Sequence, residues 1–107
     1  MKTIPQNLER KVRSFIFNEV EIEAEQIIES STIYIEAYKG NIDLGFTLDI
    51  DYNHNLSLEV YHGDYFNAPE SWFTGCAEVE EIRVYTEDED YILPLTDKIK
   101  RELNFKF

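Results

Sequence analysis

The sequence predicts one α+β domain, an antiparallel meander of about five strands with an N-terminal and a C-terminal helix packed on one face. Three observations predict this fold class. Apolar residues recur at helical spacing near both ends of the chain, and they recur at every second position through its middle. Short turn signals separate the middle segments. At 107 residues the chain suits a single domain, 1–107.

The two terminal helices follow from apolar periodicity. Pro5 suits a first helical position, because its missing N–H costs nothing there. After it, one side of a helix that ends near Asn18 carries Leu8, Val12, Phe15 and Ile16. At the other end, Pro94 and then Thr96 or Asp97 begin a final helix. Its buried stripe is formed by Leu95, Ile99 and Leu103.

Residues 19–25 alternate between glutamate and apolar residues, which predicts a first strand. A helix that continues to Ile28 is the alternative, because Glu and Ala are good helix formers. We prefer the strand, since a helix would spread the four carboxylates around its cylinder. The strand would instead gather them on one face.

Residues 32–38 are rich in β-branched and aromatic side chains and predict the next strand, which ends at a Gly40-Asn41 turn. Residues 45–52 and 56–61 then share one apolar alternation. Between them, Asn53-His54-Asn55 predicts a hairpin turn in which Asn supplies positive φ.

The second half is predicted to hold a strand over 79–85, an acidic turn over 87–90 and a short returning strand over 91–93. Before it, residues 62–77 show no period and are interpreted as a long loop. Ordered loops of such length are uncommon and often functional. The aromatic side chains of this loop belong to types enriched at interfaces, namely Tyr65, Phe66, Trp72 and Phe73. The alternative is that Trp72 and Phe73 fold back and close the end of the core.

The charge of the chain is segregated. Residues 14–97 hold 20 of the 22 acidic side chains and only two basic ones, a net charge of −18, whereas each end of the chain is basic. Nucleic acid and anionic membranes are therefore poor partners, because binding them needs a basic footprint. A basic protein is the expected partner. The basic ends themselves are expected to be solvated, or else to neutralise part of the acidic middle.

The acidic alternates of the predicted strands cannot enter the core unpaired. We therefore expect them to line the open face of the sheet, at Glu19, Glu21, Glu23, Glu36, Asp49, Asp51 and Glu59. Such a face fits a non-enzymatic interaction protein without a cofactor. Its sharper forms are an inhibitor, an immunity protein or a mimic of nucleic-acid phosphates. A structural subunit whose open sheet face is covered by another copy is a further alternative, and the sequence leaves the oligomeric state open.

Enzymatic and metal-binding alternatives have few candidate residues. His62, Asp64 and Cys76 could form a nucleophilic set. His54 would add a third zinc ligand to His62 and Cys76, but without paired spacing. The calcium-loop pattern that starts at Asp49 and Asp51 fails, since His54 and Val60 stand where Gly and Glu are needed. No metal site is therefore predicted.

The cellular compartment is predicted from features that the sequence lacks. Cys76 is the single cysteine, so an internal disulfide is impossible and a reducing compartment is the simpler interpretation. The N-terminal residues lack the apolar stretch of a secretion signal, and no apolar run is long enough to cross a bilayer. A cytoplasmic protein is expected.

The second half of the chain resembles small uncharacterised proteins carried by phages and mobile elements of Bacteroides-like bacteria. The resemblance covers about residues 56–103. It is carried by Gly63-Asp64, Ala68-Pro69-Glu70, the strand 79–84 and Leu93-Pro94-Leu95. Those proteins tend to have two adjacent prolines in the loop, where this chain has one. The resemblance implies an α+β domain of unknown function and no catalytic residues.

Overall fold

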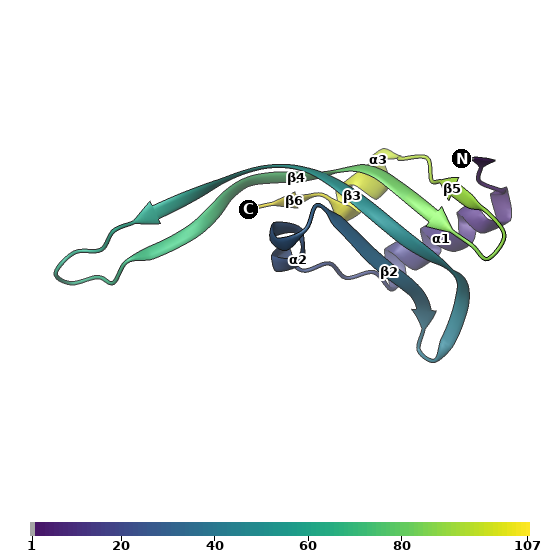
Figure 1. Cartoon of the computed structure of the whole chain (residues 1–107), viewed down its shortest axis with the longest axis horizontal. Coiled ribbons are helices and arrows are strands. Elements are labelled where there is room, and N and C mark those ends of the chain that lie inside the picture. Colours follow the sequence, from purple (N-terminus) through teal and green to yellow (C-terminus); the bar gives the residue numbers. More distant parts are fainter. Residues whose placement is uncertain (1) are drawn as a thin grey trace.

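The computed structural model describes residues 2–107 and confirms the α+β class (Figure 1). In chain order the elements are β1 (Lys2–Thr3), α1 (Gln6–Asn18), α2 (Ala24–Glu29), β2 (Thr32–Lys39), β3 (Ile42–Tyr61), β4 (Glu70–Tyr85), β5 (Asp90–Ile92), α3 (Asp97–Leu103) and β6 (Phe105–Lys106). None of the helices within residues 2–107 is long and apolar enough to cross a membrane.

The six strands form a mixed sheet, so the expected purely antiparallel meander is wrong. The strand order is β1-β5-β4-β3-β2, and β6 pairs with β4. β1 runs parallel to β5, while the remaining pairs are antiparallel. The parallel pair arises because two residues before α1 add to the free edge of β5, a contact too short to leave a periodic signal.

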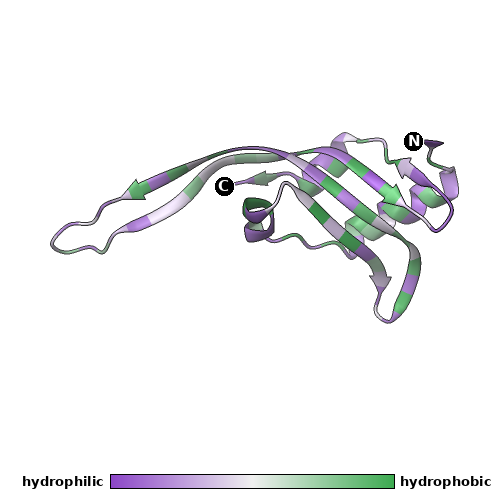
Figure 2. Ribbon diagram, viewed as in Figure 1, coloured by the Kyte–Doolittle hydropathy of each residue, from purple (hydrophilic) through white to green (hydrophobic). Residues whose placement is uncertain are grey.

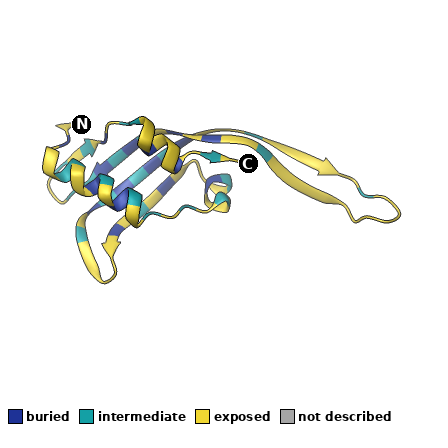
Figure 3. Cartoon of the chain, turned by 180° about the vertical axis from the view of Figure 1, so that it is seen from behind, coloured by how far each residue is buried: buried dark blue, intermediate teal, exposed yellow. Residues whose placement is uncertain are grey.

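Alternation along the strands separates two faces of the sheet. Figure 2 shows hydrophobic and hydrophilic residues alternating along β2, β3 and β4. In β3, the buried positions are Phe46, Leu48, Ile50 and Tyr52. Figure 3 shows α1 and α3 lying across this face, over the buried positions of the strands. The opposite face of the sheet is open and is called the open face below.

Helices and strands share one core. α1 contributes Phe15, whose ring meets that of Phe46 edge to face with 5.6 Å between centroids. α3 begins at its N-cap Thr96, whose side chain accepts a hydrogen bond from the Ile99 amide. The Tyr52 hydroxyl donates to the backbone carbonyl of Leu103 at 2.7 Å, and burial raises the pKa of this phenol. The buried Tyr52 therefore ties β3 to the end of α3.

The strand predicted over 19–25 is wrong, and so is a helix that continues unbroken to Ile28, because α1 ends at Asn18 and a separate helix, α2, covers Ala24–Glu29. Ile27 is fully buried in α2. The Glu23 amide donates to Gln26 Oε1 at 2.7 Å, which satisfies a group at the start of the helix. Val20 and Ile22 pack partly against the core without strand pairing. Alternation alone does not make a strand where no neighbouring strand supplies hydrogen bonds.

The predicted hairpin turn at 53–55 is also wrong, because β3 is one continuous strand. Asn53, His54 and Asn55 pair with residues 78, 77 and 76 of β4. No residue other than glycine among 2–107 has a positive φ. β4 starts at Glu70 rather than near residue 79, so the true loop is His62–Pro69. The additional length of β4 supplies the partners that keep residues 53–55 extended.

β3 and β4 leave the sheet together and form a projecting arm (Figure 1). At the transition, Asp51 pairs with Glu81 and Tyr52 with Val79, so Glu80 has no partner and forms a bulge. Bulges bend a strand and increase its twist. We define the arm as Asn55–Cys76 and its tip loop as His62–Pro69. The arm gives the molecule its long dimension, with extents of 60 × 28 × 21 Å.

Candidate functional site

The open face is built from rows of side chains that the strand register aligns. One row holds Thr32, Asp51 and Glu81. The next row holds Tyr34, Asp49, Arg83 and Ile92, and the third holds Glu36, Thr47, Tyr85 and Asp90. Arg83 is the one basic side chain among these described positions. Carboxylates therefore outnumber basic side chains on this solvent-exposed surface.

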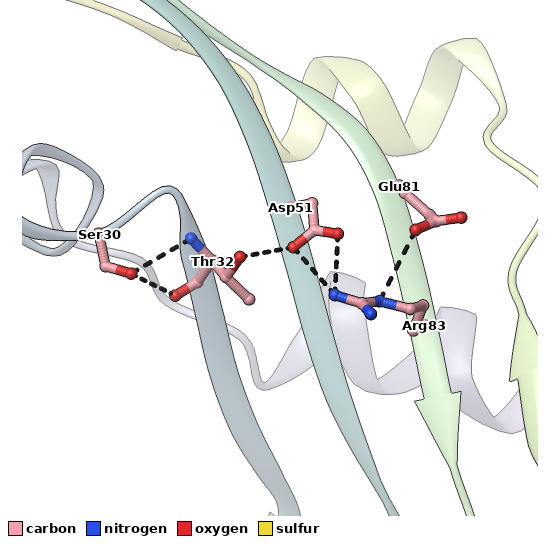
Figure 4. Close-up of polar contacts among 5 residues, drawn as sticks. All are labelled: Ser30, Thr32, Asp51, Glu81 and Arg83. Carbon is pink, nitrogen blue, oxygen red and sulfur yellow. Dashed lines mark hydrogen bonds and ion pairs between the residues drawn. The ribbon is translucent and has the colours of Figure 1, made fainter.

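Arg83 forms the centre of a polar network on this face (Figure 4). Its Nη2 lies 3.0 Å from Asp51 Oδ2 and 3.3 Å from Oδ1. Its Nε is 3.7 Å from Glu81 Oε2. The neighbouring carboxylates, Asp51 foremost, raise the pKa of the guanidinium. Asp51 also accepts a hydrogen bond from Thr32 Oγ1 at 2.6 Å, so its charge is held in place from both sides.

Asp49 and Glu36 are less neutralised than Asp51. Neither carboxylate takes part in an ion pair with any residue from 2 to 107. The pKa of the Tyr85 phenol is raised, first by burial and then by the neighbouring Asp49 carboxylate. Tyr34 is 60% exposed beside Asp49. The open face thus combines free carboxylates with tyrosine, a residue type enriched at binding surfaces.

The predicted acidic face is only partly assembled. Glu36, Asp49 and Asp51 lie together on the open face of the sheet. Glu21 and Glu23 do not, because residues 20–23 connect α1 to α2 and join no strand, and Glu19 caps the end of α1. Glu59 continues the same face out on the arm, eight residues along β3 from Asp51 and so about 26 Å away. The acidic face therefore comprises fewer residues than the sequence predicted.

Sequence reasoning missed Glu81, Arg83 and Tyr85 as members of this face. Their signal was present, because they alternate with the apolar Ile82 and Val84 in the predicted strand. What the sequence could not show was the register that sets Arg83 beside Asp49 and Asp51. That register makes one guanidinium hold the centre of the acidic face.

The basic ends of the chain mostly do not neutralise this face. Of the four ion pairs among residues 2–107, one joins an end to the acidic middle, with Lys2 Nζ 2.8 Å from Glu89. Arg13 pairs with Glu9 inside α1. Lys98 lies over the Phe17 ring at 4.9 Å. The basic ends therefore leave most of the negative electrostatic field of the open face in place.

The tip loop is built around Asp64. Its Oδ1 accepts hydrogen bonds from the amides of Phe66 and Asn67, both at 2.8 Å, and its Oδ2 accepts from the Tyr61 hydroxyl at 2.6 Å. These hydrogen bonds, that of Tyr61 first, lower the pKa of Asp64. The same contact raises the pKa of Tyr61. The turn leaves Tyr65 and Phe66 93% and 87% exposed.

Trp72 and Phe73 do not close the core, so that alternative for the predicted loop is wrong. Both lie in β4, where Trp72 pairs with Glu59 and Phe73 with Leu58. They point to opposite faces of the arm, and their side chains are 47% and 37% exposed. The four predicted aromatic residues are thus all on the arm, but they do not share one surface.

The residues of the enzymatic hypothesis are not brought together. Cys76 is exposed in β4 and pairs with Asn55, six residues along β3 from Tyr61. That spacing puts the thiol about 20 Å from the tip loop that holds His62 and Asp64. The Asp64 carboxylate is occupied by Tyr61 and backbone amides. Across residues 2–107, no three or more His, Cys, Asp or Glu side chains gather as metal ligands do.

We predict that Asp64→Ala disorders the tip loop without unfolding the domain. The variant leaves the Phe66 and Asn67 amides without their acceptor, but water can replace it because the loop is exposed. Amide hydrogen exchange at these two residues should become faster, while global stability should hardly change, as for most substitutions of exposed residues. Asp64→Asn keeps one acceptor oxygen and should restore part of the protection. Unchanged exchange in Asp64→Ala would contradict this role.

The same loop should respond to acid. The folded-state pKa of Asp64 is lowered, so its stabilising effect is complete above the ordinary carboxyl value of about 3.9. That effect is lost as pH falls through the lowered pKa. Exchange at Phe66 in wild type should therefore approach that of Asp64→Ala only under strongly acidic conditions.

Comparison of the chain with protein-family models, with curated proteins and with solved structures gives no match.

Proposed function

We propose that this chain is a non-catalytic interaction protein that binds a cationic protein through the open face of its sheet. The observation that supports the proposal most directly is the composition of that face. Asp49 and Glu36 form no ion pair with any residue from 2 to 107, and Arg83 offsets only part of the negative charge around it. A partner with lysine or arginine side chains would supply the missing counter-charges.

Physical arguments favour recognition over stability as the role of this surface. Asp51 and Glu81 lie directly opposite each other on neighbouring strands, and like charges in that position oppose folding by about 0.2–1 kcal/mol a pair. A field of one sign speeds the encounter with an oppositely charged protein, and salt weakens it. The exposed ring of Tyr34 and the side chain of Ile92, which is 41% exposed, offer apolar contact area beside the charges. Together they fit a binding surface with charged and aromatic contacts.

The sharper form of the proposal is an inhibitor, an immunity protein or a mimic of nucleic-acid phosphates. Each of these would place carboxylates against a basic groove on its target. The exposed thiol of Cys76 is compatible with a reducing compartment, and we place the interaction in the cytoplasm.

The test uses two double variants that remove equal charge. Glu36→Gln with Asp49→Asn neutralises two free carboxylates of the open face. Glu25→Gln with Glu29→Gln removes two charges from α2, outside the sheet. Asp51 is left intact because it holds Arg83. Immobilised wild type should retain cationic proteins from host lysate at low salt and release them at high salt, since salt screens the attraction.

The open-face variant should retain several-fold less of the same cationic proteins, whereas the α2 variant should match wild type. Equal loss in both variants would mean that total charge, not this face, governs retention. Absence of any retained cationic protein at low salt would reject the proposal outright.

A further inference from the structure

The arm carries an apolar surface that is separate from the acidic open face. Side chains alternate along β3 and β4, so one face of the arm continues the helix-covered face of the sheet. We call it the inner face, and it consists of Leu56, Leu58, Val60, Ser71, Phe73 and Gly75. Leu58 is 56% exposed and Val60 is 50% exposed. No helix lies over the arm, whereas α1 and α3 lie across the rest of the sheet (Figure 3).

The inner face is uncharged in a chain whose net charge is −12. Both charged residues of the paired strands of the arm, Glu59 and Glu70, point to the other face. In a two-fold dimer the same surface meets itself, so a charged surface would repel its own copy. The inner face lacks that repulsion and can pack on an identical face. Its charge pattern therefore fits a second copy of this chain.

The limited stability of an isolated arm also favours a partner. A two-stranded ribbon that stands alone in water is marginally stable, because one face of it has nothing to pack against. Here the paired strands run for seven positions, from Asn55 with Cys76 to Tyr61 with Glu70. A second inner face would give these strands the packed layer that α1 and α3 give the rest of the sheet.

The contact area that a stable dimer needs indicates how two copies would overlap. Seven positions make a ribbon about 23 Å long and, with two strands, about 10 Å wide. Contact between inner faces alone is then on the order of 230 Å² of flat area per copy. The smaller stable interfaces bury about 600 Å² per partner. The ribbons alone are therefore too small.

An antiparallel overlap brings more surface into contact. It places the tip loop of each copy at the base of the other arm, where β6 pairs with Cys76 and Ala77. Phe107 is partly exposed there, and its amide donates to the Gly75 carbonyl. Tyr65 and Phe66 can each bury about 150–250 Å² on such a contact. With the tip residues included, the area approaches that of a weak but specific dimer.

We propose that the chain forms a homodimer in which the inner faces of two arms pack antiparallel, with Leu58 near the two-fold axis and Tyr65 and Phe66 against the base of the other arm. This contact leaves the acidic open face free. The dimer and the binding of a cationic partner are therefore independent, and either can fail without the other.

The first experiment measures self-association of the full chain by sedimentation velocity across the micromolar range. Wild type should reach a monomer–dimer equilibrium, and high salt should not dissolve it, because the contact is apolar. Leu58→Glu should weaken the dimer by about tenfold or more, since two carboxylates would meet at its centre. Ser57→Glu adds the same charge one residue earlier, on the opposite face, and should change the dissociation constant little.

A second measurement keeps the test valid if Leu58→Glu disturbs the arm. In a Cys76→Ser background, Leu58→Cys should form an intermolecular disulfide far faster than Ser57→Cys, because only the former faces its copy. A wild type that stays monomeric across this range overturns the proposal. So does a dimer that Ser57→Glu weakens as much as Leu58→Glu, or one in which Ser57→Cys cross-links faster.

Discussion

Leu48→Ala should lower the free energy of unfolding by about 2–5 kcal/mol. Leu48 is fully buried at the centre of the sheet, where it pairs with Ile35 of β2 and Val84 of β4. Truncation removes methyl groups from the core and leaves a cavity, because strands held by hydrogen bonds on both sides cannot collapse inward. Domains of this size have about 5–15 kcal/mol in total. The loss would therefore be a large share of the stability.

Urea denaturation followed by circular dichroism measures this change, and Thr47→Ala is the matched control. Thr47 precedes Leu48 in the same strand but points to the open face. Its substitution should cost no more than about 1 kcal/mol, mostly through β propensity. Similar losses for the two variants would mean that the helix-covered side of β3 is not the core.

Gly75→Ala should disrupt the base of the arm. Gly75 has a φ of +119°, outside the range that other residues adopt, and a Cβ atom there would overlap the backbone carbonyl of Asn55 in the paired strand. The strained backbone alone costs about 1–3 kcal/mol. The overlap adds to that, because neither backbone can move without breaking the ladder between β3 and β4. We expect faster amide exchange throughout the arm and a lower unfolding midpoint.

Gly40→Ala separates the two causes. Gly40 also has a positive φ, of +63°, but an added Cβ would meet nothing within 4 Å. Its cost should be about 1–2 kcal/mol from the left-handed conformation, without any effect on the arm. Amide protection in the arm of Gly75→Ala that equals wild type would show that the close approach to Asn55 does not exist in solution.

The candidate site was predicted in its chemistry but not in its extent. Alternation in 45–52 correctly assigned Asp49 and Asp51 to the open face, because a strand with one buried face has a fixed phase. The same logic misplaced Glu21 and Glu23, where alternation had no neighbouring strand to pair with. It could not identify Arg83 as the ion-pair partner of Asp51, since cross-strand neighbours depend on register rather than on local sequence.

For the arm too, the sequence indicated one part of the structure and strand pairing decided the other. The apolar positions of β3 keep the same phase on both sides of residues 53–55, from Tyr52 to Leu56, and this shared phase was the available sign of one long strand. Asn-His-Asn looked like a turn because asparagine favours turns in isolation. Pairing with residues 76–78 overrides that preference, because each extended residue gains partners for its backbone groups.

The sequence by itself determined which segments are amphipathic and which face of each is apolar. It thereby determined α1, β2, the core half of β4 and α3, since burial of one stripe or one face follows from local periodicity. The tertiary structure alone decided strand length, register, the parallel edge at β1 and the projection of the arm. These features depend on hydrogen bonds and contacts between residues distant in the chain. A local sequence pattern does not reveal the free energy of such contacts.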